Sequence, residues 1–149
     1  MGRKFLAAMM LAFVIIVSAC SAGSGGNAAG SNLAVHGDLV SHGACVLQSR
    51  YMPGESIVFR VDVKDTVTGK QAEDAEVKVH LSNGETLDMV YGSHGETAKF
   101  WTVSYSITED TELGTLNYYV TAKTSNKSGE FYPFDVEPSL LTIVAKDET

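Results

Sequence analysis

The chain has 149 residues, two cysteines and a formal net charge of −7, from 18 acidic and 11 basic side chains. This length accommodates one domain of ordinary size with its own hydrophobic core, and two cysteines exclude a fold that depends on several disulfides. The acidic balance argues against a nucleic-acid partner and against attachment to anionic lipid by charge.

The chain opens with a short apolar run behind two positive charges. Arg3 and Lys4 precede the run, which extends without interruption from Phe5 to Val17. As a helix of thirteen residues it would be roughly 20 Å long, short of the ~30 Å hydrocarbon core of a bilayer. A positive start, a short apolar centre and a small-residue exit are typical of a secretory signal peptide. We predict a signal peptide over residues 1–19.

The exit from this run holds the first cysteine. Val17-Ser18-Ala19-Cys20 resembles the lipobox of bacterial lipoproteins, in which an aliphatic and two small residues precede a cysteine. In that family the thiol receives a diacylglycerol, the signal is cleaved just before it, and the new amino group is often acylated. The resemblance covers residues 1–20 and implies that Cys20 is the lipid attachment point. It also implies a chain anchored to a bacterial membrane and facing the periplasm or the cell exterior, because two or more acyl chains anchor a protein stably.

A segment of small residues separates this cysteine from the first patterned sequence. Residues 21–32, SAGSGGNAAGSN, carry no charge, no aromatic ring and no periodicity. Such a segment behaves as a flexible coil with an r.m.s. reach of ~20 Å. We expect residues 20–33 to form a lipidated tether and residues 34–149 to form the single folded domain. The signal peptide holds two of the positive charges, so the remaining chain carries −9, and membrane contact is expected only through the lipid on Cys20.

Alternating apolar and polar residues recur along the rest of the chain and predict an all-β fold. Before the second patterned segment, MPGE (residues 52–55) suits a type II turn, with Pro at its second and Gly at its third position. About seven strands in roughly 100 residues is the spacing of an immunoglobulin-like sandwich. We predict a single immunoglobulin-like antiparallel β-sandwich of about seven strands, preceded by the signal helix and the tether. The predicted strands are 44–51, 56–64, 76–81, 87–91, 99–107, 115–122 and 139–146.

The hairpin around residues 82–84, Ser-Asn-Gly, has two conceivable registers. A two-residue Asn-Gly loop would place Leu87 and Met89 on the polar face of the strand. A three-residue loop pairs Val79 with Leu87 and Val77 with Met89, which keeps one face apolar. We therefore predict the three-residue loop, with its glycine in the left-handed conformation.

The segment ITEDTELGTLNYYVTA resembles the penultimate strand of immunoglobulin-like and fibronectin-type domains. An acidic residue and a glycine precede the alternating Leu116, Tyr118 and Val120. The resemblance implies that Tyr118 is a tyrosine corner and that Val120 takes the place of the second cysteine of antibody domains. As architecture it extends over residues 40–146, but no disulfide pair is present and the single tryptophan lies in the strand before, so the chain looks like a bacterial extracytoplasmic module. The apolar face of each strand predicts a shared core of Trp101, Phe59, Val61, Val79, Tyr118 and Val120.

The sequence carries no catalytic or cofactor motif. It lacks a CxxCH haem site, an HExxH helix, a GxSxG elbow, a phosphate-binding loop and a CxxC pair. Glu109, Asp110 and Glu112 lack the spacing of a calcium loop and are expected to be solvated. A sandwich without a nucleophile and base leaves no residues for catalytic roles, so we expect no enzyme activity and no cofactor. The favoured hypothesis is a binding or accessory module for an envelope protein, and a purely structural envelope protein is a further alternative.

Copper binding is the other hypothesis. If Cys20 carries lipid, Cys45 is an unpaired thiol, and His42, Met52 and His94 add imidazole and thioether donors of the kind that copper prefers. Cys45 is equally consistent with an inert buried thiol. No two histidines have a two- or four-residue spacing, and both SHG segments are consistent with exposed loops. The copper hypothesis names His42, Cys45, Met52 and His94 as its ligands.

Overall fold

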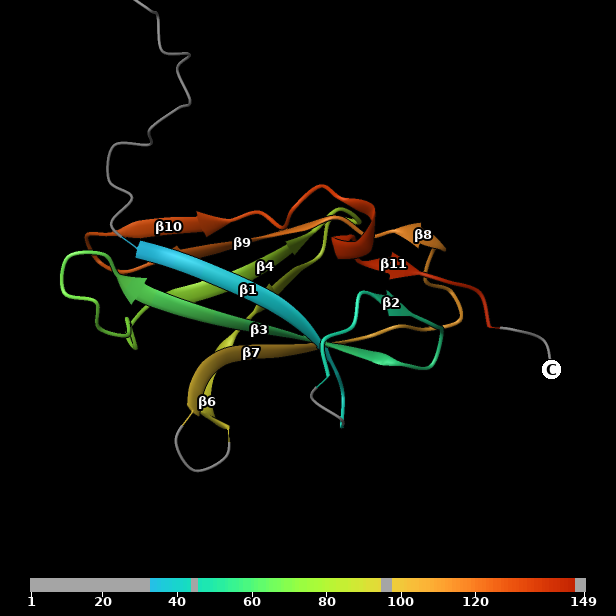
Figure 1. The fold of residues 1–149 in the computed structure, drawn as a ribbon, viewed down its shortest axis with the longest axis horizontal. Helices are drawn as coiled ribbons and strands as arrows, with labels where there is room; N and C mark the ends of the chain where they lie inside the picture. The colour runs from blue at the N-terminus through green and yellow to red at the C-terminus, as the bar shows by residue number, and fades with distance from the viewer. Residues whose placement is uncertain (1–32, 44–45, 95–97, 147–149) are drawn as a thin grey trace, which may run out of the picture.

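In the computed structural model the described residues are 33–43, 46–94 and 98–146. They form two four-stranded sheets that face each other and a small third sheet at one end (Figure 1). The first sheet runs β1 (Leu33–Ser41), β3 (Ser56–Asp65), β7 (Ala98–Ser106), β6 (Val90–His94). The second runs β10 (Ser128–Phe131), β9 (Tyr118–Lys123), β4 (Glu76–Leu81), β5 (Thr86–Asp88). The third runs β2 (Arg50–Tyr51), β11 (Thr142–Ile143), β8 (Gly114–Thr115).

The strand order is that of an immunoglobulin fold. If β1, β3, β4, β5, β6, β7, β9 and β10 are lettered A, B, C, C′, D, E, F and G, the large sheets read ABED and GFCC′. Every pair within these two sheets is antiparallel. The helical structure in the described part of the chain is a single 3₁₀ turn, η1 (Glu137–Ser139). No helix there is long and apolar enough to cross a bilayer. The predicted all-β immunoglobulin-like sandwich is confirmed.

The first strand lies before the segment that the sequence indicated. Residues 44–51 were expected to form it, but of the described residues 46–51 only Arg50–Tyr51 are assigned to a strand, and β1 occupies Leu33–Ser41. The pattern of β1 is hard to recognise because Gly37 occupies a position that faces the core, where the alternation calls for an apolar side chain. The Phe131 ring fills this space, since its atoms lie 3.1 Å from where a Cβ on Gly37 would stand. The first residue of β1, Leu33, was expected to be the last residue of the tether.

Other boundaries differ from the sequence prediction as well. The expected strand over residues 87–91 is divided, because β5 pairs with β4 in one sheet and β6 pairs with β7 in the other. The chain crosses between the sheets at Met89, which is buried. The expected strand over residues 139–146 is reduced to the two-residue β11. β10 was not expected because its sequence, SGEF, contains one large apolar residue.

The predicted hairpin register is confirmed. Val79 pairs with Leu87, and the Met89 N–H donates to the Val77 carbonyl at 2.9 Å. Gly84 has φ +92°, so the three-residue loop ends in the left-handed conformation that glycine adopts without strain. The MPGE turn is also present, with φ +93° at its glycine and a 3.0 Å hydrogen bond between its end residues.

The predicted core is buried between the two large sheets. Each of its six residues is at most 8% exposed. Phe59 from the first sheet meets Tyr118 from the second in an edge-to-face contact, with ring centroids 5.1 Å apart. Such contacts stabilise beyond the area that they bury. The confirmed core residues are Trp101, Phe59, Val61, Val79, Tyr118 and Val120.

Candidate functional site

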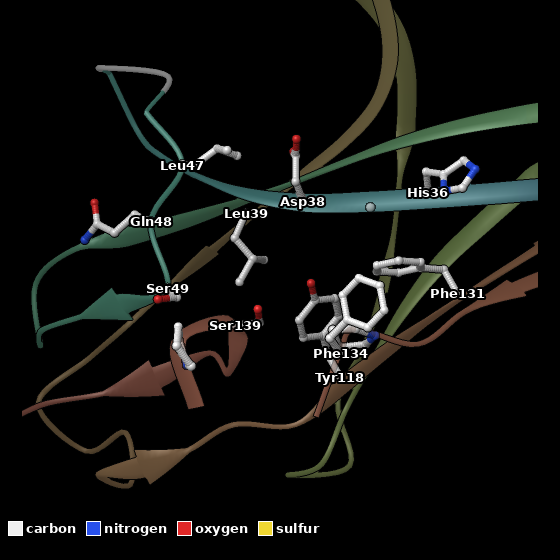
Figure 2. A pocket seen from close by; sticks show the side chains of 13 residues that line it. His36, Asp38, Leu39, Leu47, Gln48, Ser49, Tyr118, Phe131, Phe134 and Ser139 are labelled. Carbon is white, nitrogen blue, oxygen red and sulfur yellow. The ribbon is translucent and has the colours of Figure 1, made fainter. Parts of the chain in front are cut away.

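A hollow opens on the side of the sandwich where β1 and β10 are the outermost strands. β10 ends at Phe131, and the chain then continues through Pro133 and Phe134 toward η1. This segment diverges from β1, and a hollow of about 490 Å³ lies between them (Figure 2). We call this hollow the β1 groove; its lining residues include Gly37, Leu39, Leu47, Tyr118, Phe131 and Phe134.

Aromatic rings form much of the wall of the β1 groove. Figure 2 shows the rings of Tyr118, Phe131 and Phe134 gathered below β1, with the Leu39 side chain on the same side of the strand. Burial, aided by the negative charge of Asp38, raises the pKa of Tyr118 to about 12. Like any tyrosine hydroxyl at physiological pH, that of Tyr118 is protonated, and it places a hydrogen-bond donor beside the rings of this wall.

Two large apolar side chains are exposed beside this wall. Leu47 is 67% exposed and Phe134 is 79% exposed. Both line the groove, Leu47 from the segment after β1 and Phe134 from the segment after β10. Single exposed apolar residues are ordinary on protein surfaces. Two of them beside a ring-lined hollow are instead typical of a surface that another molecule covers.

The free edge of β1 also contributes backbone groups to the groove. The Leu39 carbonyl accepts from the Gln48 N–H at 3.2 Å, and the Ser41 N–H donates to the Val46 carbonyl at 2.9 Å. Both bonds lie on the edge away from β3, with which β1 forms its ladder. Because the bonding direction alternates along an antiparallel strand, the N–H and C=O of Gly37 point to this same edge. Among the described residues no strand pairs with β1 on this edge at Gly37, so a donor and an acceptor are available there for strand pairing.

A second hollow, of about 590 Å³, lies on the outer face of the β1-β3-β7-β6 sheet. Val58 and Phe100 contribute apolar surface to it, and His42 and His94 both line it. The His94 ring lies 6.0 Å from the Phe100 ring, and its Nε2 is 3.4 Å from the Thr102 hydroxyl. We call it the histidine hollow. It brings together two of the four residues that the copper hypothesis names.

Of the other two residues of that hypothesis, the structure places Met52 elsewhere and does not describe Cys45. Met52 is not among the residues that line the histidine hollow. It belongs to the turn before β3, where its N–H donates to Glu55 Oε2 at 2.7 Å. Cys45, like Cys20, lies outside the described residues. Among the residues described, no three His, Cys, Asp or Glu side chains are arranged to hold a metal ion.

The outer face of the second sheet carries a row of stacked rings. His80 and Tyr119 are 4.5 Å apart at 13°, and Tyr119 and Tyr132 are 5.4 Å apart at 12°. The hydroxyls of Thr121 and Thr86 lie 2.9 and 3.3 Å from the two ring nitrogens of His80. The rings stack on one another, and Tyr119 and Tyr132 are still 36% and 63% exposed.

Sequence reasoning missed both the β1 groove and the row of rings. Leu47 was assigned to a strand, although its exposure shows that it is not part of the core. Phe134 lies in a connection whose course depends on where β10 ends. The row of rings depends on cross-strand register, which places His80 opposite Tyr119. A cluster of aromatic residues between 131 and 134 was the available signal.

Comparison with known proteins adds little to this picture. No protein-family model and no curated protein sequence matches the chain. The chain is similar to the Lin-41 filamin domain, known from a crystal structure, at 13% sequence identity and a TM-score of 0.37. The likeness covers 77% of this chain and 94% of that one. At this level the likeness supports no functional argument, and the fold assignment rests on the order of the strands.

Proposed function

We propose that this chain is a lipid-anchored extracytoplasmic binding module whose β1 groove receives a segment of an envelope protein. The observation that carries the proposal is the ring-lined hollow with Leu47 and Phe134 exposed beside it. When a partner covers apolar surface of this kind, its removal from water stabilises the complex by about 25 cal/mol per Å². The immunoglobulin-like scaffold provides a rigid support for the connections that form the groove.

The lipobox supports the anchored part of the proposal. We expect the wild-type protein to fractionate with membranes, to resist extraction by salt and to incorporate labelled palmitate. Cys20→Ser should abolish labelling and leave unprocessed or mislocalised protein. Cys45→Ser is the matched control and should leave labelling unchanged. A wild-type protein that takes up no label and washes off with salt contradicts the anchor.

Site-specific photo-crosslinking in the producing cell tests the binding part. A photoreactive amino acid replaces Leu47 or Phe134, one at a time, and Val67 is the control because it is exposed to the same degree as Phe134, 79%. Val67 lies in the turn after β3 and does not line the groove. We expect discrete crosslinked species from positions 47 and 134 and none from 67. Equal crosslinking at all three positions would count against the groove as the binding surface.

Copper binding at the histidine hollow is the second candidate, because His42 and His94 line the same hollow. Imidazoles are suitable copper ligands, although two of them do not complete a site. In a Cu(I) titration of the full chain, His42→Ala and His94→Ala should each weaken binding by at least about tenfold. His36→Ala is the control, since His36 does not line this hollow. Equal affinities in all three variants would exclude the histidine hollow.

A further inference from the structure

We propose that the occupant of the β1 groove is an extended polypeptide segment that pairs with the free edge of β1, with one large apolar side chain in the hollow and basic residues on either side. This inference rests on the proposed function and specifies the chemistry of the partner. Three features of the groove support it: its backbone edge, its apolar wall and the charges around it.

The backbone edge favours an extended partner. At the end of β1, Val40 already forms an isolated antiparallel bridge with Leu47. This bridge shows that the edge away from β3 accepts strand-like pairing. The donor and acceptor of Gly37 lie on the same edge, two residues before Leu39. A partner in extended conformation can pair with them, as in strand addition to an exposed sheet edge.

The available edge is short, so side chains must supply most of the affinity. Toward the start of β1, β10 approaches closely: a Cβ on Gly129 would stand 2.4 Å from the Leu33 carbonyl oxygen. Toward the end of β1, the Leu39 carbonyl already accepts a hydrogen bond from the Gln48 N–H. Only the stretch around Gly37 remains between them. The hollow beside it is large enough for an aromatic or large aliphatic side chain, and its apolar wall favours one.

The charges near the groove favour a basic partner. Glu130 in β10, Asp135 in the segment that follows and Glu137 in η1 are exposed around the groove without lining it. Two arginines in this region are paired with acids. Arg60 is held by both carboxylate oxygens of Asp38, at 2.8 and 2.6 Å, and Arg50 lies 3.9 Å from Glu137. The acidic residues here outnumber the basic ones, as they do in the chain as a whole, which favours association with a cationic segment.

Selection from a displayed library of random twelve-residue peptides tests the inference on the full chain in detergent. Peptides are selected on the wild-type protein and depleted on the double variant Leu47→Ala Phe134→Ala. We expect the recovered peptides to be net basic and to contain a large apolar residue. They should bind Val67→Ala like wild type and the double variant at least about tenfold more weakly.

N-methylation of single backbone positions in the recovered peptides then tests the extended pairing. Methylation should weaken binding by at least about tenfold at alternate positions and change it by less than about twofold between them, because backbone groups of an extended strand alternate in direction. The inference would be overturned if the consensus peptides were acidic or uncharged, or if methylation had the same effect at every position. It would also be overturned if no recovered peptide distinguished the double variant from wild type. Crosslinks at positions 47 and 134 would then still uphold the proposed function, whereas their absence would remove both.

Discussion

The two long sides of the sandwich are closed in different ways. On the β5–β6 side the chain itself crosses from one sheet to the other, and the crossing residue Met89 is buried. The next strand packs the Tyr91 ring against Trp101, with centroids 5.3 Å apart. On the β1–β10 side no connection crosses directly between the two strands. There Gly129 allows the backbones to come close at one end, and the strands diverge at the other to leave the β1 groove.

This difference explains where a binding surface can form. The β5–β6 side, which we call the covalent side, packs the rings of Tyr91 and Trp101 against each other, although Val90 on its outer face is 70% exposed. The β1–β10 side, which we call the open side, is closed by contact between the backbones of β1 and β10 over a short distance. Beyond that point its apolar side chains are only partly covered. A partner strand that enters there completes the closure that the chain leaves unfinished. The predictions below measure how much stability each side contributes.

The largest expected loss of stability is at the covalent side. Trp101→Ala removes a ring that is 6% exposed, and should lower the free energy of unfolding by ~3–5 kcal/mol. Phe134→Ala, on the open side, should change it by less than ~0.5 kcal/mol, since that ring is mostly in solvent. Urea denaturation monitored by circular dichroism provides both values. Similar losses in the two variants would show that the groove is part of the core.

A third variant separates the packing of the ring from the burial of its unpaired N–H at the same position. The indole N–H of Trp101 is buried and has no hydrogen-bond partner among the described residues. Trp101→Phe keeps an aromatic ring and removes this donor, so its cost should be smaller than that of Trp101→Ala. In the wild-type protein, tryptophan emission should be blue-shifted and poorly quenched by iodide until the protein unfolds.

Alanine substitutions at two glycines compare the stability of the two sides directly. Gly129→Ala on β10 would place a Cβ 2.4 Å from the Leu33 carbonyl oxygen, and the resulting separation of β10 from β1 should cost ~1–3 kcal/mol. Gly92→Ala on β6 is the matched control, because nothing lies within 4 Å of its added Cβ. That variant should be neutral or stabilising by up to ~1 kcal/mol, through the lower entropy of the unfolded chain. Equal effects would mean that the close approach of β10 and β1 contributes nothing.

These glycines also show why part of the fold could be predicted from sequence and part could not. β3, β4 and β9 carry uninterrupted alternation, and their core positions, such as Phe59 and Val79, were predicted correctly. In β1 and β10 the inward positions include Gly37 and Gly129, so the alternation is broken where the backbones approach. The division of one predicted strand at Met89 was also unpredictable, because the residues around it keep facing the core while their partners change.

The candidate site was less predictable than the core for a related reason. A core position follows from the local alternation of its own strand, whereas the β1 groove is formed by segments that lie far apart in the chain and come together only in the fold. Leu47 and Phe134 carry no local pattern that marks them as neighbours. Of the four residues in the copper hypothesis, His42 and His94 are neighbours in one hollow, which their sequence separation did not indicate.

At alkaline pH the tyrosines near the open side should limit stability. Burial, together with the nearby charges of Glu55 and Asp38, raises the pKa of Tyr51 to about 12, and Tyr118 has a similar pKa. Below the ordinary pKa of 10.0, both folded and unfolded states are protonated, so this contribution is fully present. Above it the unfolded state ionises first, and the free energy of unfolding should fall until about pH 12. Tyr118→Phe should remove part of this fall in pH-dependent urea denaturation, whereas an unchanged slope would contradict the assignment.

The smallest expected effect concerns an ion pair across the open side in acid. Lys127, in the β9–β10 hairpin, pairs with Asp65 at the end of β3. The hydrogen bond from Lys127, with those from the backbone N–H groups of Thr68 and Val67, lowers the pKa of Asp65 from 3.8 to about 2. Because the folded-state pKa is the lower one, this contribution is present above pH 3.8 and is lost as the pH falls toward 2.

The ion pair connects the two sheets on the side that lacks a covalent crossing. Loss of its charge should therefore loosen β1 and β10 before it affects the β5–β6 side. Above pH 5, where the ion pair contributes fully, amide hydrogen exchange should be faster in β1 and β10 of the Lys127→Met variant than in wild type, and should be unchanged in β6. Above pH 5 the same variant should have a slightly lower free energy of unfolding than the wild type, because it lacks the ion pair. The wild type loses this contribution in acid, so the two free energies of unfolding should converge as the pH falls. Equal acceleration in β1, β10 and β6 would mean that the ion pair supports the whole sandwich, and that its open side is no weaker than its covalent one.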